Sequence, residues 1–311
     1  MNSLPGPSLS AVIPTFGRNS ILVDSVEHML SLREPADEIV VIDQTAQHDA
    51  RTEAMLGAWQ SEGRIRWLRL TPPSIPKAMN VGLRESRGPL VLFLDDDIRP
   101  HEGLVAAHRR AHEVPAVGAV VGMVLQPGEV PVERDESADR MSGLWRDLRF
   151  PFNSTAPCDV SNVMAGNLSV KKDVALAAGG FDERFVGVAY RFETEFCRRL
   201  LRGGCRVRYE PLGVIDHLRA TRGGTRTFGS YLNSPRPEHS VGDYYFALVE
   251  GQSGERWRYV VRRFVREVAT RYHLTHPWWI PTKLLGELRG LRLARKLVGA
   301  RKVEARRTGT D

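Results

Sequence analysis

The sequence predicts an α/β protein with a mostly parallel sheet flanked by helices, followed by a helical and basic C-terminal extension. Strand-like and helix-like segments alternate along the first hundred residues, as they do in successive βαβ units. The chain has 311 residues, of which 42% are hydrophobic, so it is long enough to bury a large core. Its excess of positive charge falls entirely after His217.

The alternating region contains four expected strands and three expected helices. Apolar runs and strict alternation predict strands, whereas apolar residues three or four positions apart predict helices. The expected strands are residues 9–14, 38–43, 64–70 and 90–94, and the expected helices are residues 20–32, 49–60 and 76–87. Parallel sheets bind ligands beyond the carboxyl ends of their strands. The first candidates for a site are therefore Thr15, Asp43 and the aspartates 95–97.

The rest of the chain is less regular. Residues 126–159 have no clear period and predict surface loops, whereas residues 160–217 return to an ordered pattern. Residues 219–240 are rich in Gly, Arg, Ser and Pro and predict a mobile loop. Two basic helices are expected after it, one with an apolar face from Trp257 to Tyr272 and one at residues 283–302.

The charge distribution and the cysteines disfavour several classes of protein. Residues 1–217 contain 25 Lys and Arg against 29 Asp and Glu, a net charge of −4, whereas residues 218–311 contain 19 against 8, a net charge of +11. This asymmetry argues against a nucleic-acid-binding protein and favours an acidic body with a basic arm. Three cysteines without CxxC spacing disfavour a disulfide scaffold or a structural zinc site and fit a reducing cytosol.

The N-terminal segment and the hydropathy pattern predict no membrane span. The first residues lack a basic n-region, and their apolar stretch is too short for a signal peptide. No run approaches the ~18 apolar residues of a spanning helix. We therefore expect a cytoplasmic protein that is soluble or, at most, peripheral on the inner face of the cell membrane.

The strongest local feature is the run of Asp95, Asp96 and Asp97 directly after an apolar strand. Three carboxylates at the mouth of a buried strand repel one another, and a divalent cation offsets that repulsion most simply. Oxygen ligands suit Mg²⁺ or Mn²⁺, which in turn bridges to a diphosphate. The alternative is an ordinary acidic turn that ends the strand. The FLDDD context and Asp43 at the end of another strand favour the metal site.

Two further places are candidates for nucleotide contacts. Asp43 ends the second strand, where its carboxylate either accepts hydrogen bonds from a nucleobase or ribose or caps the next helix. Lys77 and Asn80 share one face of a predicted helix, so a cation and an amide lie together where they can address a nucleotide. The alternative for these two side chains is contact with water alone.

Six segments occur in a characteristic order: PTFGR (14–18), VVID (40–43), KAMNVG (77–82), FLDDD (93–97), AGNLSVKKDVALAAGGFDE (165–183) and FETEFCRRLLRGG (192–204). In order and spacing the chain resembles family 2 glycosyltransferases with the GT-A fold, a Rossmann-like sheet flanked by helices. Among them it is most similar to bacterial rhamnosyltransferase-like members. The resemblance covers about residues 8–220. It implies a catalytic domain at residues 1–220, a flexible loop at 221–240 and a basic helical extension at 241–311.

The resemblance also implies roles for individual residues. The loop after the first strand, the ends of two other strands and one helix face are expected to hold the nucleotide sugar. The implied residues are Pro14, Thr15, Arg18, Asp43, Lys77, Asn80, Asp95 and Asp96. Asp97 matches the metal ligand of the family's DxD motif, in which Asp95 is the ribose-side aspartate. Gly166 and Asn167 match a segment that lines the sugar and acceptor pocket.

The implied catalytic base departs from the family pattern. The family commonly has a Glu-Asp pair whose aspartate deprotonates the acceptor hydroxyl, and here Phe192 and Glu193 occupy the two positions. Glutamate has the same chemistry but reaches one methylene further, and a displacement of about 1 Å can cost ~10²-fold in rate. Glu193 is the predicted base, with Glu195 as its competitor. An acidic first turn that only stabilises the helix fits Glu195 better.

His217 precedes a Gly-rich loop, and in this family a histidine at such a place can complete the metal site. Asp97, His217 and diphosphate oxygens then form the expected site for Mg²⁺ or Mn²⁺. A structural or solvated histidine is the alternative. The nearby arginines either fold over the diphosphate or remain solvated loop charges; they are Arg219, Arg222 and Arg226.

The basic C-terminal helices have two interpretations. A basic amphipathic helix followed by Pro277, Trp278 and Trp279 suits an anionic membrane surface, where Trp favours the interface. Alternatively, the Val and Phe residues pack against the body and the arginines form a solvated face. No nucleic-acid partner is expected, because no recognised binding motif is present.

Together these features predict an inverting glycosyltransferase. It would move a sugar from a nucleotide-diphosphate sugar to a glycan or lipid-linked acceptor in cell-surface polysaccharide or glycolipid synthesis. One alternative is a sugar nucleotidyltransferase, which normally needs a Gly-rich phosphate loop where only Gly17 is present. The other is a non-catalytic membrane or complex partner on the same fold, supported only by the altered pair at Phe192 and Glu193.

Overall fold

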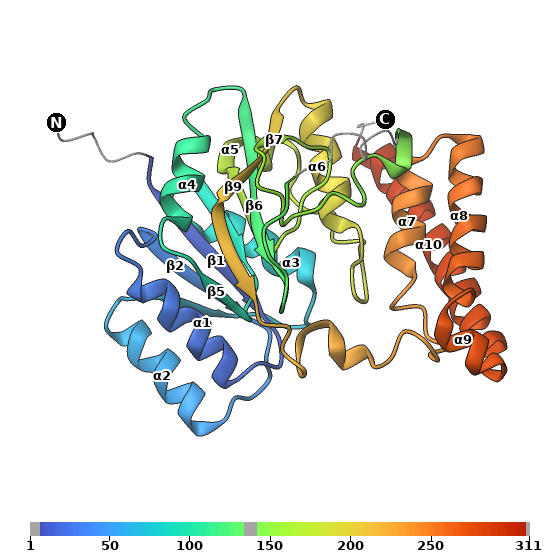
Figure 1. Cartoon of the computed structure of the whole chain (residues 1–311), viewed down its shortest axis with the longest axis horizontal. Coiled ribbons are helices and arrows are strands. Elements are labelled where there is room, and N and C mark those ends of the chain that lie inside the picture. The colour runs from blue at the N-terminus through green and yellow to red at the C-terminus, as the bar shows by residue number, and fades with distance from the viewer. Residues whose placement is uncertain (1–6, 134–141, 309–311) are drawn as a thin grey trace.

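The structure is a computed structural model that describes residues 7–133 and 142–308. The described residues form one nine-stranded sheet in the order β3-β2-β1-β4-β8-β6-β9-β5, with β7 paired to β9. Figure 1 shows this sheet and its covering helices as one body, with the C-terminal helices α7 to α10 standing beside it.

All four strands and all three helices expected in the first hundred residues are present. The strands are β1 (Leu9–Thr15), β2 (Glu38–Asp43), β3 (Arg66–Arg69), β4 (Leu90–Leu94), β5 (Ile98–Pro100), β6 (Val117–Leu125), β7 (Cys158–Asp159), β8 (Asn167–Lys171) and β9 (Arg206–His217). The helices of the body are α1 (Ser20–Ser31), α2 (Ala50–Ser61), α3 (Ile75–Glu85), α4 (Leu104–Ala111), α5 (Lys172–Ala177) and α6 (Phe192–Arg202). The C-terminal helices are α7 (Val241–Glu250), α8 (Ser253–Val268), α9 (Arg271–Thr275) and α10 (Ile280–Thr308).

The sheet is mixed, whereas the sequence predicted a mostly parallel one. β1 pairs in parallel with β2 and β4, and β2 pairs in parallel with β3. β8 then lies antiparallel to both β4 and β6. A parallel connection needs a crossover, usually a helix. The long segment between β6 and β8 contains only the 3₁₀ helix η2 (Gly143–Trp145) and β7 among its described residues, and β8 returns in the opposite direction. Residues 134–141 of the expected loop lie outside the described residues.

The sheet has a core on each face, because successive side chains of a strand point to opposite sides. Ile13 of β1 packs in the cluster that includes Val26 of α1, whereas Val12 packs in the cluster that includes Met79 of α3. This double burial explains why the β1, β2 and β4 sequences read as continuous apolar runs.

β9 brings a distant part of the chain to the three aspartates. It pairs antiparallel with β5, and His217 lies opposite Ile98, the residue after Asp97. The backbone amide of Leu218 donates a hydrogen bond to the carbonyl oxygen of Asp97 at 2.8 Å. The turn after β4 and the end of β9 are thereby fixed side by side.

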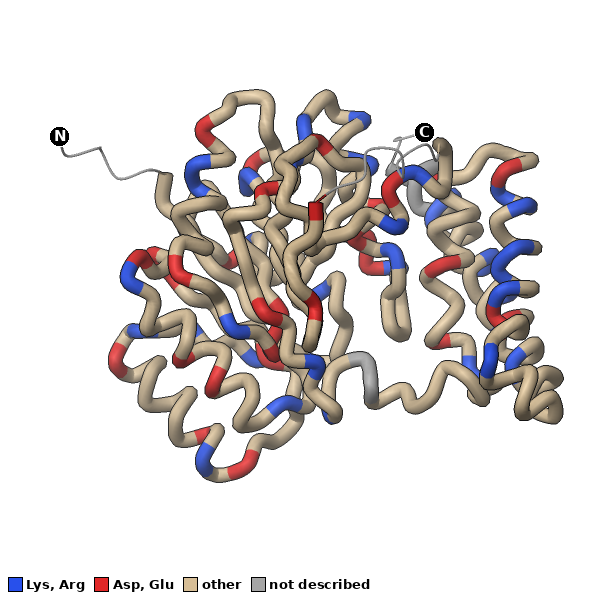
Figure 2. Tube along the Cα trace, in the orientation of Figure 1, with Lys and Arg blue, Asp and Glu red and all other residues tan. Residues whose placement is uncertain are grey.

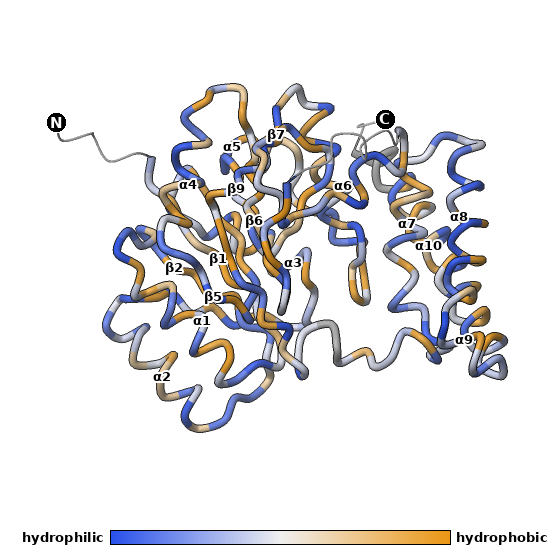
Figure 3. Tube along the Cα trace, in the orientation of Figure 1, coloured by the Kyte–Doolittle hydropathy of each residue, from blue (hydrophilic) through white to orange (hydrophobic). Residues whose placement is uncertain are grey.

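The apolar stripe expected on the first basic helix is divided between two faces of α8. Val260 is buried and Phe264 packs against the core, whereas Trp257, Val261 and Val265 have exposed fractions of 44%, 61% and 60%. Figure 2 shows Lys and Arg at many positions along α8, and Figure 3 shows hydrophobic positions between them. Packing therefore accounts for only part of the stripe. Within the described residues, no helix combines the length and apolar character needed to cross a bilayer.

Candidate active site

A cleft of about 310 Å³ opens at the carboxyl ends of β1 and β4, the sheet edge at which the sequence placed the site. Its volume lies in the usual range for small-molecule sites, ~300–1,000 Å³. The predicted site residues that line it are Pro14, Thr15, Arg18, Asp95, Asp96, Asp97, Gly166, Glu193 and His217. These residues come from the turns and termini of five separate segments, so the tertiary fold assembles the cleft.

Asp95, Asp97 and His217 form a compact cluster in this cleft. Nε2 of His217 lies 3.3 Å from Oδ1 of Asp97 and 3.7 Å from Oδ2 of Asp95. One ligand atom from each residue lies within 4.8 Å of the others. Two carboxylates and one imidazole are a ligand set that suits Mn²⁺ and is compatible with Mg²⁺. The sequence predicted a cation site at the run of three aspartates and at His217. The structure brings Asp95, Asp97 and His217 together and leaves Asp96 outside this cluster.

Hydrogen bonds hold this cluster in place. Nδ1 of His217 lies 3.2 Å from Oε1 of Gln126, and the amide of Ala220 donates to Oδ2 of Asp97 at 2.8 Å. Burial alone would raise the pKa of Asp97, but His217 and the Ala220 amide outweigh it and hold that pKa below its ordinary value. Burial opposes a charged His217, yet the two carboxylates raise its pKa above the ordinary value. The ionised carboxylate needed for a metal ligand is therefore favoured at Asp97.

Asp96 has a different environment from its neighbours. Its Oδ2 accepts a hydrogen bond from Oγ1 of Thr15 at 2.6 Å, and its Oδ1 lies 3.3 Å from Nε of Arg18. Burial raises the pKa of Asp96 to about 7, although Arg18 and Thr15 oppose that rise. Asp96 thus ties the loop after β1 to the turn after β4.

The loop after β9 folds back onto the loop after β1. Arg18 donates from Nη1 to the carbonyl oxygen of Arg222, and the amide of Gly224 donates to the carbonyl of Phe16 at 2.7 Å. The side chains of Arg219 and Arg222 are exposed and lie outside the cleft lining. The side chain of Arg226 lies outside the described residues. The contacts that this loop makes with the cleft therefore come from its backbone.

Gly166 meets a steric requirement beside Asp95. A Cβ atom at this position would lie 2.2 Å from Oδ2 of Asp95, so any other residue would displace the carboxylate. The carbonyl oxygen of Gly166 also accepts a hydrogen bond from the amide of Asp95 at 3.3 Å. Gly166 therefore positions Asp95.

Glu193 is placed in the cleft by the first turn of α6. Burial and the nearby Asp95 carboxylate raise the pKa of Glu193 to about 7, against the effect of Arg191. A general base is most effective when its pKa lies near the working pH. Phe192, the departure from the family pattern, is buried and contacts Phe181 with ring centroids 5.6 Å apart. Phe192, a core residue, thus stands where the family commonly has a glutamate.

Glu195, the predicted competitor of Glu193, lies outside the cleft. Its carboxylate is fully buried, and its two oxygens accept hydrogen bonds from Nε and Nη2 of Arg199, each at 2.8 Å. Residues two apart on a helix point about 200° apart, so one of the two glutamates faces the cleft and the other the helix packing. The structure separates the two candidates that the sequence left open.

Three other predicted residues lie outside the cleft lining, and two of them, Asn80 and Asn167, form internal hydrogen bonds. Asn80 donates from Nδ2 to the carbonyl oxygen of Phe181 at 2.8 Å and to Oε1 of Glu183 at 2.9 Å. Asn167 is fully buried and donates to the carbonyl oxygens of Met123 and Gly213. Lys77 is half-buried on α3, away from the cleft lining. Asn80 and Asn167 hold neighbouring segments together, because buried amides require hydrogen-bond partners.

Asp43 ends β2 as predicted, directly opposite Thr15, but its carboxylate is fully buried. Its Oδ2 lies 2.8 Å from Nε2 of His48 and accepts from Nε1 of Trp67 at 2.8 Å. His48 and Trp67 thus bind the carboxylate that the sequence offered as an acceptor for a nucleobase or ribose, or as a helix cap. Gln44, which the sequence analysis missed, lines the cleft instead. The signal was available, since Gln44 immediately follows the same strand.

The N-terminal part of the chain is similar to a known protein family. The model of "Glycosyl transferase family 2" matches residues 10–174. Two curated proteins from two strains of Mycobacterium tuberculosis, each named "Pre-mycofactocin glycosyltransferase", are 28% identical to the chain over 218 residues. The match covers 68% of this chain and 43% of each relative, so the chain spans less than half the length of the curated relatives it matches.

Solved structures share the fold. The mannosyltransferase PcManGT from Pyrobaculum calidifontis, in complex with GDP-Man and Mn²⁺, has a TM-score of 0.56 and 19% identity, covering 98% of this chain and 83% of that one. GalNAc-T7 with UDP, GalNAc and Mn²⁺ has a TM-score of 0.58 and 14% identity, covering 88% and 58%. TarS of S. aureus has a TM-score of 0.53 and 13% identity, covering 86% and 44%. The fold is therefore the GT-A fold with a helical C-terminal region.

Proposed function

The chain belongs to glycosyl transferase family 2, and we propose that it transfers a sugar from a nucleotide-diphosphate sugar to an acceptor hydroxyl with inversion of configuration. One observation carries this proposal: the cluster of Asp95, Asp97 and His217 and the carboxylate of Glu193 line the same cleft. Such a transfer needs ligands for a divalent cation and a general base, and Glu193 has a pKa of about 7.

On the donor side, Asp95, Asp97 and His217 would hold Mn²⁺ or Mg²⁺, which when bound neutralises charge on the leaving diphosphate. Nη2 of Arg18 lies 3.5 Å from Oδ2 of Asp97 and helps to fix that carboxylate. Two proteins of the same fold were crystallised with Mn²⁺, one with GDP-Man and one with UDP and GalNAc. These two complexes support a nucleotide sugar and a divalent cation for this chain.

On the acceptor side, Glu193 removes the proton from the acceptor hydroxyl. The acceptor oxygen forms a bond to the anomeric carbon as the bond to the diphosphate oxygen breaks, and the proton remains on the Glu193 carboxyl. Because attack and departure occur on opposite faces of the sugar ring in one displacement, the configuration inverts.

Two observations disfavour the alternative functions. Family 2 membership favours a glycosyltransferase over a sugar nucleotidyltransferase. The altered pair at Phe192 and Glu193 was the support for a non-catalytic protein. Phe192 packs in the core while Glu193 keeps its carboxylate in the cleft, so this alteration is compatible with catalysis.

A glycan or lipid-linked acceptor of the cell surface remains part of this proposal, together with peripheral contact with a membrane. The exposed residues Trp257, Val261 and Val265 lie beside an arginine row that begins at Arg258, a surface that suits anionic lipid. Flotation with phosphatidylglycerol vesicles tests this contact. No excess binding over phosphatidylcholine vesicles would contradict it.

A thermal-shift panel tests the proposed function directly. UDP-, GDP-, dTDP- and CMP-sugars are added with and without Mn²⁺, and the melting temperature is measured. We expect one nucleotide family to stabilise the protein in the presence of Mn²⁺, because binding to the native state alone raises stability. Absence of a shift with every nucleotide sugar would overturn the proposed function.

A further inference from the structure

A second groove adjoins the cleft on the side of the C-terminal helices. Its volume is about 520 Å³, and Val188 and Tyr190 line both the groove and the cleft. Its other walls come from residues 229–239 and from α8 and α10. The two hollows therefore meet at the segment that immediately precedes Phe192 and the predicted base.

Helix α7 and the loop before it fix this shared wall. A Cβ atom at Gly187 would lie 2.6 Å from the carbonyl oxygen of Glu238, and one at Gly242 would lie 2.4 Å from that of Tyr190. Nε of Arg191 lies 3.3 Å from Oδ1 of the buried Asp243 of α7. These close approaches fix the segment before α6 against α7 and against the loop that precedes α7. The groove and the position of Glu193 thus depend on the same packing.

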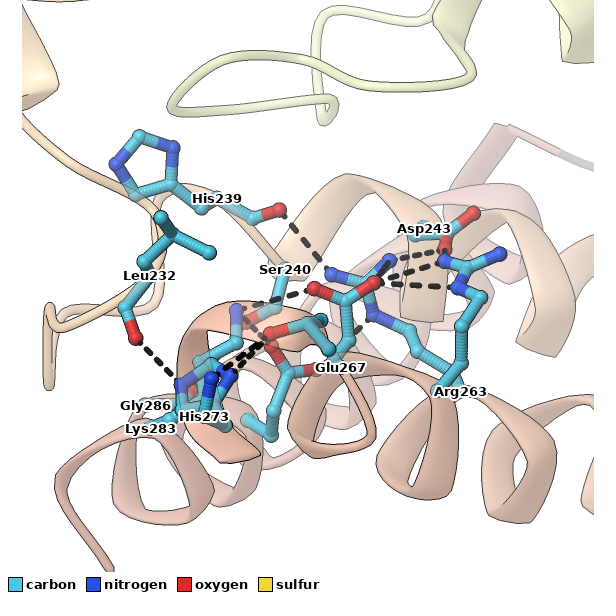
Figure 4. Close-up of polar contacts among 12 residues, drawn as sticks. Leu232, His239, Ser240, Asp243, Arg263, Glu267, His273, Lys283 and Gly286 are labelled. Atoms are coloured by element: carbon cyan, nitrogen blue, oxygen red, sulfur yellow. Dashed lines mark hydrogen bonds and ion pairs between the residues drawn. The ribbon is translucent and has the colours of Figure 1, made fainter. Parts of the chain in front are cut away.

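Ion pairs neutralise the buried charges at the floor of the groove. Figure 4 shows Asp243, Arg263, Glu267 and Lys283 converging from α7, α8 and α10. Nζ of Lys283 lies 3.2 Å from Oε2 of Glu267 and 2.9 Å from Oε1 of Glu287. Arg263 pairs with Asp243 and, through Nε, with Glu287 at 3.0 Å.

Arg266 also lines the groove and is half-exposed. Its Nη2 lies 3.0 Å from Oε1 of Glu267. The described cations of this groove therefore have carboxylate partners, which disfavours a phosphate ligand. A surface of paired charges still donates and accepts hydrogen bonds, as the hydroxyl groups of a neutral ligand require.

Two tyrosine rings complete the groove. Tyr190 and Tyr231 line it with exposed fractions of 45% and 55%. Nζ of Lys283 lies 5.8 Å from the ring centroid of Tyr231, which places a cation against that ring. An exposed tyrosine offers an apolar face together with a polar tip. Such a face suits the C–H side of a sugar ring, and the neighbouring polar groups suit its hydroxyls.

We propose that this groove binds a neutral glycan, the acceptor, whose reactive hydroxyl passes Tyr190 to reach Glu193. The identification of this glycan as the acceptor rests on the proposed function. The presence of a sugar-binding site in the groove does not. It assigns acceptor recognition to residues 229–239 and to the C-terminal helices. The family resemblance implied that Gly166 and Asn167 line the sugar and acceptor pocket, but Asn167 is fully buried at the start of β8.

Saturation-transfer NMR with methyl glycosides of glucose, galactose, mannose, rhamnose and N-acetylglucosamine tests the groove. We expect at least one glycoside to give a signal that falls several-fold in Tyr231→Ala and persists in Tyr231→Phe, which keeps the ring. Trp278→Ala is the matched control, because Trp278 is an aromatic residue with an exposed fraction of 64% outside the groove. Its signal should equal that of the wild type.

Three results would overturn the proposal: no signal from any glycoside, equal signals in Tyr231→Ala and Trp278→Ala, or displacement of the glycoside by inorganic phosphate. Binding of UDP and GDP with Mn²⁺ is measured on the same samples. It should be unchanged in Tyr231→Ala, and Asp97→Ala should lose it while keeping the glycoside signal. A wild-type protein that binds the glycoside but no nucleotide would overturn the proposed function and leave the sugar-binding groove in place.

Discussion

Nε2 of His217 lies 3.3 Å from Oδ1 of Asp97, although one residue ends β9 and the other precedes β5. The pairing of Ile98 with His217 fixes this approach, and the backbone bond from Leu218 to Asp97 reinforces it. The proposed cation site is therefore built by strand pairing as much as by the aspartate run itself.

Asp97→Ala should weaken Mn²⁺ binding at least tenfold, because it removes the more buried carboxylate of the cluster. Isothermal titration with Mn²⁺ alone measures the effect. Asp216→Ala is the matched control, since this carboxylate adjoins His217 in sequence but bonds to His101 at 3.1 Å. Equal Mn²⁺ affinity in the wild type and Asp97→Ala would show that the cluster is not the site.

Glu193→Gln should lower turnover by about 10²- to 10⁴-fold, the usual contribution of a general base, while nucleotide affinity stays within about twofold. Initial rates are measured with the nucleotide sugar that the thermal-shift panel identifies. Glu195→Gln serves as the comparison. It breaks a buried ion pair with Arg199, so we expect a stability loss of about 3–5 kcal/mol. Full turnover in Glu193→Gln would remove Glu193 from the mechanism.

The pH profile should include the titration of Glu193. A base must be deprotonated to accept the acceptor proton, and burial raises the pKa of Glu193 to about 7. We therefore expect kcat/KM to rise as pH increases through about 7 and to level off above it. The residual activity of Glu193→Gln should lack this rise. A wild-type profile that is flat between pH 5.5 and 8.5 would contradict the assignment.

Gly166→Ala should weaken Mn²⁺ binding about tenfold, because the new Cβ would lie 2.2 Å from Oδ2 of Asp95. Gly57→Ala is the matched control: it lies within α2, and no atom stands within 4 Å of its added Cβ. That control should keep Mn²⁺ affinity and gain up to roughly 1 kcal/mol of helix stability. Titration calorimetry and thermal melting separate the two effects. Similar Mn²⁺ affinity in both variants would argue against the positioning role of Gly166.

His108 should make the fold sensitive to acid. Its Nδ1 lies 2.7 Å from Oγ of Ser169 and its Nε2 lies 2.9 Å from Oδ1 of Asn167, and burial lowers its pKa to about 4. As pH falls, His108 therefore takes up a proton in the unfolded chain at a higher pH than in the folded protein. The contribution of neutral His108 to the free energy of unfolding is complete above about pH 6.5. It is lost as pH falls from there towards 4, and the loss reaches roughly 2 kcal/mol at pH 5.

Urea denaturation at pH 7.5 and pH 5.0 measures this loss in the free energy of unfolding. In His108→Gln the difference between the two pH values should shrink by roughly 2 kcal/mol, since the titrating group is gone. An unchanged difference would mean that other groups govern acid sensitivity.

The strands and their carboxylates could be predicted because their signals are local. The apolar run of β4 ends where Asp95 begins, and β2 ends at Asp43, so periodicity alone located both polar ends. The mixed order of the sheet could not be predicted in this way. β8 pairs with β4 and β6 across long stretches of chain, and such pairing leaves little trace in a short segment.

The sequence by itself determined the α/β class, the family and the edge of the sheet at which the site lies, because strand patterns and motif order are properties of neighbouring residues. The tertiary structure decided which polar side chains enter the cleft. Glu193 enters it while Glu195 pairs with Arg199, and Asp43 turns to His48. The physical reason is that burial and long-range partners set the direction of each side chain, and residues two positions apart in one helix can meet opposite environments.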